Sequence, residues 1–320
     1  MPACFMTDVI DDGSLVSGLM SPLPASGWHQ PVMVGEVLEC LAPHPGAVFV
    51  DGTVGTGGHS LAILPRLLPS GRLVALDRDR EMLEIAQRRL VEFDPHVTFL
   101  HGNFRQLPQL LSPLGLSRVD GLLVDLGLCS RHVDEPARGF SFSQEGPLDM
   151  RMDGAQVTTA AELLRTCNAD DLAQILETYG EERFAKRIAR RIVEARRTQP
   201  ITTTAQLARL VTSVLPLGSR HGRLHAATRT FQALRIAVND ELGALQEWLR
   251  CLPTLLGPRG RAVVLTFHSL EDRLVKQAFA QGAREGLWTV LTKKPARPTD
   301  EEVASNPRAR SAKLRAVERR

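Results

Sequence analysis

AVFVDGTVGTGGHSLAIL, residues 47–64, is the stretch that decides the fold. An apolar, β-branched run ends at Asp51, four glycines follow within seven residues, and a helical apolar pattern comes after them. Strand, glycine turn and helix form a βα unit, in which small residues let a ligand lie against bare backbone. The stretch therefore predicts a nucleotide-type binding site at the end of a parallel strand.

Strand-like and helical runs alternate on both sides of this loop. Between residues 134 and 227 the pattern is helical without a convincing strand, and sheet signals then return. This order predicts an α/β fold with a doubly wound parallel sheet and an inserted all-helical domain. The strand-like runs lie at 47–51, 72–77, 97–102, 120–125, 261–267 and 287–292.

Two local features of the second half give sharper expectations. Residues 228–252, TRTFQALRIAVNDELGALQEWLRCL, have a helical apolar pattern and predict one long helix. Ser269, with Asp272 three residues later, predicts a capping box at the start of the helix that follows the 261–267 strand.

Composition narrows the class of protein. The 320 residues, with 43% hydrophobic and 23% charged side chains, can bury one large core or a core with an insert. No apolar run approaches about 18 residues and the N-terminal stretch lacks a basic region, so we expect a cytoplasmic protein without a membrane span. The five cysteines lack metal-ligand spacing, so neither a disulfide framework nor a metal site is expected.

Positive charge gathers in two segments. From Lys293 onward there are nine Lys or Arg against four Asp or Glu, although the whole chain carries only +3. Residues 181–200 contain seven Lys or Arg on a helical pattern whose apolar stripe recurs every four residues. Both segments predict contact with nucleic-acid phosphates, and for 181–200 a solvated helix face is an equally good interpretation. The tail residues expected at phosphates are Lys293, Lys294, Arg308, Arg310, Lys313 and Arg315.

The residues around the loop discriminate between nucleotides. A Walker A loop ends in Gly-Lys-Ser/Thr, whereas His59 and Ser60 follow the glycines here. Asp51 would repel a pyrophosphate, but it would favour the positive sulfonium and amino groups of S-adenosylmethionine. Asp77, at the end of the next strand, can accept both hydroxyls of a ribose, and Asn103 and Phe104 after the third strand can meet an adenine edge and face. A methyltransferase site is the prediction.

The remaining motifs resemble a known family. The chain is similar to the bacterial 16S rRNA (cytosine-N4)-methyltransferases, the RsmH or MraW family, from about His29 to about Glu318. RGFSF and GPLDMRMD, within residues 138–153, are the most specific of the shared motifs. The others are HQPVM (29–33), GTGGHS (55–60), YGEERFAKRIARRIVEAR (179–196), TRTFQALRIAVNDEL (228–242), TFHSLEDRLVK (266–276) and NPRARSAKLRAVER (306–319).

This resemblance implies a class I, Rossmann-like methyltransferase that uses S-adenosylmethionine and methylates N4 of cytidine 1402, in conventional 16S rRNA numbering, within the small ribosomal subunit near the decoding centre. It also implies the division of the chain. The expected parts are a flexible N-terminal segment (1–28), the first part of the methyltransferase domain (29–133), a substrate-recognising helical insert (134–227), the second part of the methyltransferase domain (228–298) and a basic tail (299–320).

The family's cofactor contacts can be carried onto matching positions of this chain. They fall on Gly57, Gly58, His59, Asp77, Phe104 and Asp125. Where the family has a glutamine after the fourth strand, this chain has His132. A histidine offers one hydrogen bond at each ring nitrogen in place of the paired donor and acceptor of an amide, so His132 is expected at the cofactor but with changed hydrogen bonding.

The chemistry of the reaction suggests catalytic residues. The lone pair of the cytosine amine is delocalised, so the enzyme must align it and accept hydrogen bonds from its N–H groups. Asp125, or the backbone carbonyls after it, is the expected acceptor. Phe140 or Phe142 is expected to stack the flipped base.

Two other functions stay open at this level. An RNA-binding module that keeps the cofactor without turnover would fit the change at His132 and a neighbouring Cys129. A dinucleotide-dependent dehydrogenase is disfavoured by Asp51 and by the glycine spacing. The sequence leaves a homodimer open.

Overall fold

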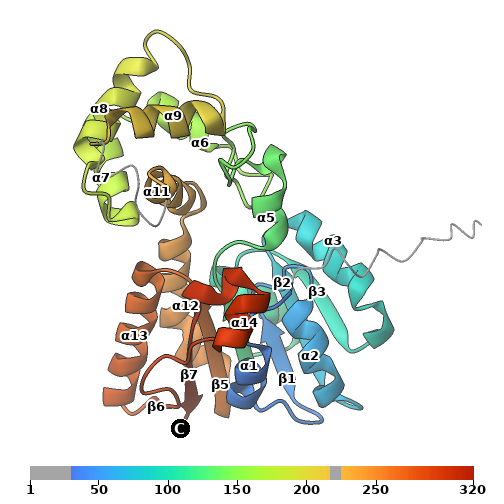
Figure 1. Ribbon diagram of the computed structural model, residues 1–320. Coiled ribbons are helices and arrows are strands. Elements are labelled where there is room, and N and C mark those ends of the chain that lie inside the picture. Colours follow the sequence, from blue (N-terminus) through green and yellow to red (C-terminus); the bar gives the residue numbers. More distant parts are fainter. Residues whose placement is uncertain (1–29, 217–224) are drawn as a thin grey trace, which may run out of the picture.

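A seven-stranded sheet forms the base of the computed structural model, which describes residues 30–216 and 225–320 (Figure 1). The strand order is β3-β2-β1-β4-β5-β7-β6, with β7 antiparallel to both of its neighbours and β1 to β5 parallel. The expected N-terminal segment and His29 lie outside the described residues. The strands are β1 (Val48–Asp51), β2 (Arg72–Asp77), β3 (Val97–His101), β4 (Val119–Asp125), β5 (Leu256–Thr266), β6 (Trp288–Val290) and β7 (Lys313–Arg319).

The order of the strands fixes where a ligand can bind. From β1 the chain winds outward through β2 to β3, then returns to place β4 on the other side of β1. The connections leave β1 and β4 in opposite directions, so a crevice opens beyond their carboxyl ends. This arrangement confirms the predicted Rossmann-like, doubly wound sheet.

Helices cover both faces of the sheet because side chains alternate along each strand. Leu122 and Val124 of β4 point into one buried cluster, and Leu123 points into the other. The helices against the sheet are α1 (Val34–Leu41), α2 (Gly58–Leu67), α3 (Arg80–Arg89), α4 (Leu107–Leu111), α12 (Glu241–Leu255) and α13 (Ser269–Arg284).

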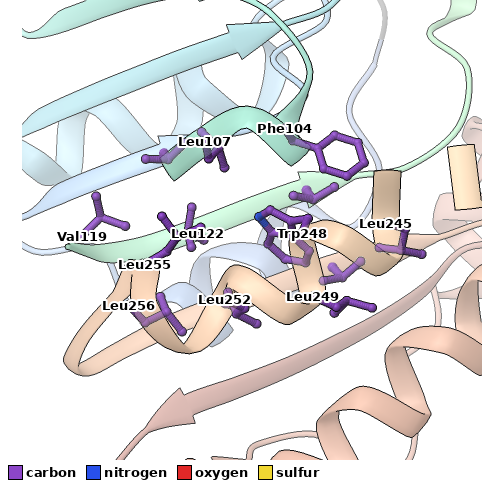
Figure 2. Close-up of a cluster of buried hydrophobic side chains, with 14 of the residues drawn as sticks. Phe104, Leu107, Val119, Leu122, Leu245, Trp248, Leu249, Leu252, Leu255 and Leu256 are labelled. Carbon is purple, nitrogen blue, oxygen red and sulfur yellow. The ribbon is translucent and has the colours of Figure 1, made fainter. Parts of the chain in front are cut away.

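The largest fully buried side chain is Trp248 of α12. It packs among leucines of the same helix, with Leu107 and Leu122 nearby and the ring of Phe104 edge-on at 6.2 Å (Figure 2). Phe104 also borders the ligand cavity described below. The core on this face of the sheet therefore continues up to the binding site.

A separate helical lobe stands above the sheet (Figure 1). Its own buried cluster runs from Phe140 to Val238, so α11 belongs to the lobe and the expected boundary at residue 227 is about a helix too early. Asp240 has a left-handed backbone (φ 46°), which divides the predicted long helix into α11 and α12. The lobe helices are α6 (Ala160–Thr166), α7 (Ala169–Gly180), α8 (Ala185–Ala195), α9 (Thr204–Val214) and α11 (Thr228–Asn239).

The expected basic tail is part of the fold. Residues 299–320 form α14 (Asp300–Ser305), a short 3-10 turn and β7, which pairs with β5 along six residues. Lys313 and Arg315 both bind Asp272, at 2.9 and 2.7 Å, and Arg315 is buried. Asp272 therefore pairs with both positive charges within the fold, and the contact of Lys313 and Arg315 with RNA stays a prediction that this pairing disfavours.

The expected capping box was displaced by one residue. His268 is the N-cap of α13 and pairs reciprocally with Glu271. Ser269 instead donates to Glu181 of the lobe. Across 30–216 and 225–320, no helix has the length and apolar character needed to cross a membrane.

Replacing Trp248 with alanine is expected to lower the free energy of unfolding by about 3–5 kcal/mol, because a fully buried ring would leave a cavity. The free energy of unfolding of Trp248→Phe should fall much less, since the indole N–H has no hydrogen-bond partner among the described residues and none is lost. Chemical denaturation of both variants measures the two values. Equal losses would contradict this packing argument.

Candidate active site

A cavity of about 350 Å³ opens at the carboxyl ends of the strands. Residues that follow β1, β2, β3 and β4 line one side, and Met152 and Arg235 from the lobe region line the other. Its volume lies within the range of pockets that hold small ligands and cofactors. The cavity therefore sits at the switch point of the sheet, as the strand order requires.

The glycine loop shapes the floor of this cavity. Gly52 and Gly55 line it, and a Cβ on Gly52 would come within 3.3 Å of the Leu123 carbonyl oxygen. Gly58 lines it as well. Gly57 does not: it has φ 82° at the start of α2, and its missing Cβ makes room for Leu90. The predicted contact of Gly57 is corrected to a role in the turn, and sequence spacing alone did not identify Gly52 and Gly55.

Asp51 lies beneath the loop and is not part of the cavity wall. Its carboxylate accepts hydrogen bonds from the Ser60 hydroxyl (2.8 Å) and the Thr53 backbone N–H (3.2 Å). Burial raises the pKa of Asp51 to about 6. Asp51 therefore orders the loop from behind, and the predicted direct contact with a cofactor was wrong.

Asp77 lies where the sequence predicted it, at the cavity wall after β2. One carboxylate oxygen accepts from the Gly55 backbone N–H (2.8 Å) and the other from the Asp79 backbone N–H (2.9 Å). A carboxylate has about four acceptor positions, so both oxygens can still accept from a ribose diol. The two backbone bonds fix the direction in which the remaining lone pairs point.

Asn103 and Phe104 line the same end of the cavity. The Asn103 side-chain oxygen is engaged by the Arg105 backbone N–H (3.2 Å), which caps a 3-10 turn. Phe104 is held edge-on by Trp248. Packing and capping therefore hold both residues in the positions from which they face a ligand.

His132 lines the cavity and is held from behind by Asp79. Its Nε2 lies 2.8 Å from the Asp79 carboxylate, which also binds Arg138 at 2.6 Å. Although burial opposes it, these hydrogen bonds lower the pKa of Asp79 to about 2, so the carboxylate is ionised. Nε2 must then carry a proton. The buried Nδ1 has no partner among the described residues, so it is left available to a ligand.

Asp125 and His59 meet at the centre of the cavity. Oδ2 of Asp125 lies 3.6 Å from Nδ1 of His59, and Nε2 of His59 lies 2.9 Å from the Val32 carbonyl oxygen. Oδ1 of Asp125 is buried without a hydrogen-bond partner in the described parts of the chain. Such an atom is an open acceptor: it calls for a hydrogen-bond donor that the described residues do not supply.

Neither predicted base-stacking phenylalanine reaches the cavity wall. Phe140 is buried in the lobe cluster with its ring 5.2 Å from that of His132, and Phe142 packs against Phe231 at 4.8 Å. The prediction that one of them stacks a base is corrected: both rings are already packed. Phe267, directly after β5, lines the cavity and was not identified from the sequence.

A polar cluster borders the cavity through Arg235, Glu241 and Glu271. Arg235 binds both oxygens of Glu241 at 2.7 Å, and His268 lies 3.0 Å from Glu271. Glu241, His268 and Glu271 come close enough together to hold a metal ion. The guanidinium of Arg235 already neutralises Glu241, so the cluster is satisfied as an ion-pair network. It consists of two local pairs, Arg235 with Glu241 and His268 with Glu271, and the sequence gave no signal that the two pairs lie together.

The chain matches known proteins along nearly its whole length. The family model described as the MraW methylase family matches residues 26–320. A relative from Syntrophotalea carbinolica, named ribosomal RNA small subunit methyltransferase H, is 50% identical over 91% of this chain and 98% of its own. Proteins of the same name from Geobacter sulfurreducens and Heliobacterium modesticaldum are 48% and 46% identical, each over 91% of this chain and 98% of their own.

Solved structures align at much lower similarity. The crystal structure of a putative rRNA methylase from Clostridium thermocellum is 11% identical, with a TM-score of 0.43, over 91% of this chain and 98% of that one. The fold assignment therefore depends on the strand order and on the family match.

The dependence of stability on pH in wild type and in His59→Gln should reveal the pKa of His59. Burial lowers the pKa of His59 from 6.5 to about 4. Between these values the unfolded chain binds a proton there and the folded chain does not, so wild type should lose about 3 kcal/mol relative to His59→Gln as the pH falls from about 6.5 to about 4.

Denaturation of the two proteins at both ends of this pH range measures the difference. His44→Gln, at an exposed position, is the matched control. If His59→Gln and wild type change in parallel with pH, His59 titrates normally and the cavity wall is more open than the structure shows.

Proposed function

The chain belongs to the MraW methylase family and is an S-adenosylmethionine-dependent methyltransferase, and we propose that it methylates N4 of a cytidine in 16S rRNA of the small ribosomal subunit. The name of its relatives supports small-subunit rRNA as the substrate class. The observation that carries the choice of an exocyclic amine is the open acceptor Oδ1 of Asp125. The proposed nucleotide is position 1402, near the decoding centre, as the sequence resemblance implies.

The cavity fits the methyl donor at its nucleoside end. Asp77 offers acceptors to the ribose diol, Asn103 a polar edge and Phe104 an apolar face to the adenine, while bare backbone at Gly55 allows close approach. The open Nδ1 of His132 is a further hydrogen-bonding atom on the same wall. The bound donor supplies an electrophilic methyl group on a sulfonium.

The residues of the chain must align and polarise the amine. Asp125 closes the end of β4, where its backbone N–H is fixed by the Thr53 hydroxyl at 2.7 Å. Its Oδ1 can accept an N4–H, which raises electron density on the nitrogen and directs its lone pair. Phe267 is the side chain that we propose stacks the base, because it is aromatic, lines the cavity and follows β5 directly.

The test is transfer of a labelled methyl group from S-adenosylmethionine to small subunits that lack the modification, followed by digestion to nucleosides. N4-methylcytidine is the expected product. Asp125→Ala should reduce the rate by about 10²–10³-fold, as loss of a preorganised hydrogen-bonding group does. Glu84→Ala, at an exposed position of α3, should keep the wild-type rate.

A different methylated nucleoside would refute the assignment of N4. Cofactor binding without transfer to subunits or naked 16S rRNA would favour the noncatalytic RNA-binding module, and His132→Gln would then be the variant in which to look for restored transfer.

The exposed face of α8 is the proposed RNA-phosphate contact. Arg187 and Arg190 are exposed and form no ion pair within the described residues, while Ile188 and Ile192 are fully buried in the lobe core. The helix therefore has a fixed apolar side and a basic side left for a partner.

Replacing both Arg187 and Arg190 with glutamine should reduce the salt slope of rRNA affinity by about 1.5, because each phosphate contact contributes about 0.7–0.9. The control is the Arg66→Gln, Arg88→Gln pair, which removes the same charge from exposed positions on the sheet domain. Filter binding across a salt series gives the slope. If the two double variants have equal slopes, Arg187 and Arg190 make no phosphate contact, and the basic face of α8 is a solvated surface.

A further inference from the structure

We propose that Asp125 exchanges a proton for the positive charge of the bound methyl donor: it releases its proton when the sulfonium form binds, and takes one back from the amine when the donor becomes a neutral sulfide. The inference deepens the proposed function and rests on it, because the proton that returns is the one an exocyclic amine must lose. It depends on the geometry around the Asp125 carboxyl group.

The tautomer of His59 is fixed by the backbone. A carbonyl oxygen only accepts hydrogen bonds, so Nε2 of His59, 2.9 Å from the Val32 oxygen, must carry a hydrogen. Burial lowers the pKa of His59 to about 4, so the ring is neutral near physiological pH. Its Nδ1 is then a bare lone pair, and it faces Oδ2 of Asp125 at 3.6 Å.

Two facing lone pairs repel unless a proton lies between them. A protonated Oδ2 donates toward Nδ1 of His59, and the distance needs only a small closure to become a hydrogen bond. Oδ1 then remains a carbonyl-type acceptor on a residue that lines the cavity, and it has no partner in the described residues. The geometry thus favours a neutral Asp125 in the protein without cofactor.

The charges around Asp125 favour the same protonation state. Asp51 lies at the end of β1, Glu271 on α13 and Cys129 in the segment after β4, and each of these groups is neutral or negative. Burial, and then the negative charges of Asp51 and Glu271, raise the pKa of Asp125 well above its usual range. Burial also raises the pKa of the Cys129 thiol to about 11, so that group stays neutral.

Among residues 30–216 and 225–320, the one basic side chain within ion-pair distance of Asp125 is that of His59. Because burial lowers the pKa of His59 to about 4, this ring is neutral. Glu271 keeps its own charge because His268 donates to it and Arg235 lies near, although burial opposes this. Three arginines also line the cavity, but Arg235 pairs with Glu241, Arg308 with Asp134, and Arg78 donates to the Asn239 carbonyl oxygen. A positive ligand therefore supplies the counter-charge that Asp125 lacks. Its arrival favours the ionised form of Asp125 by direct attraction.

The charges balance through one turnover. The site begins with a neutral Asp125, which loses one proton to water as one positive charge enters with the donor. In the transfer the carbon–sulfur bond breaks, the carbon–nitrogen bond forms and the positive charge passes to N4. The N4 proton then moves to the Asp125 carboxylate, and the site ends as neutral as it began.

Calorimetric binding of S-adenosylmethionine and of its neutral sulfide product, S-adenosylhomocysteine, tests the exchange without RNA. Titrations in buffers of different ionisation enthalpy count the protons released. We expect about one more proton released with the sulfonium than with the sulfide near neutral pH. The affinity for the sulfonium should also rise with pH, by up to about tenfold per pH unit, while that for the sulfide stays nearly constant.

The Asp125→Asn variant resembles the protonated acid in shape and cannot titrate. It should show no proton difference between the two ligands. Glu84→Gln makes the same chemical change at an exposed position and should keep the difference. Because the pH series uses wild type alone, the inference is testable even if Asp125→Asn folds poorly.

Equal proton release for the two ligands in wild type overturns the inference, and so does a difference that survives in Asp125→Asn. Neither outcome bears on the methyl acceptor, because N4-methylcytidine formation is measured separately. Conversely, the proton difference can appear in an enzyme whose product is another nucleoside. The two experiments therefore distinguish a failure of one proposal from a failure of the other.

Discussion

The buried carboxylate of Asp51 is the contact on which the geometry of the site depends. It binds the Thr53 backbone and the Ser60 hydroxyl, and so joins the end of β1 to the loop and to α2. Thr53 in turn accepts a hydrogen bond from the Asp125 backbone at the end of β4. One side chain therefore couples the two strands that flank the switch point. The position of Asp125, and the floor on which a cofactor lies, follow from it.

A second constraint joins the lobe to the sheet at the end of α11. Asn239 accepts from the Met152 backbone and donates to the Met150 carbonyl, and its own carbonyl accepts from Arg78. The left-handed Asp240 then turns the chain into α12 and is bound by Arg105 at 2.5 Å. These contacts bring Arg235 over the cavity. The lobe has a core of its own, but its placement is decided at this junction.

The sequence predicted the parts of the site that follow from strand ends. Asp77 and Asp125 end parallel strands and Asn103 and Phe104 follow one closely, and parallel strands present their carboxyl ends at one edge. The sequence did not predict which of these strand-end side chains line the cavity and which are buried beneath the loop. Asp51 also ends a strand, yet it points beneath the loop, because Ser60, nine positions later in the first turn of α2, gives it a hydrogen-bond donor.

The sequence also did not predict which side chains from distant segments pack against each other. Phe140 and Phe142 belong to a distinctive motif, but Phe231, more than eighty residues later, packs against Phe142 in the lobe core. The density of charge in the C-terminal segment predicts a basic tail, whereas the structure has α14 and β7 there. Asp272, which pairs with Lys313 and Arg315 of β7, lies on α13, so the cancellation of those charges appears only in three dimensions.

The insertion of the lobe between β4 and β5 has a consequence for how the chain reaches this structure. Gly121 of β4 pairs with Arg261 of β5, 261 − 121 = 140 positions later, so this central pairing is highly non-local. Closing so long a loop has a large entropic cost, and non-local pairings form slowly. The lobe has its own hydrophobic core, and its helix contacts, such as those of α7 with α8 and with α11, span shorter stretches of chain than the pairing of β4 with β5. We therefore expect it to collapse first, which draws its two ends together and shortens the connection that the sheet has to close.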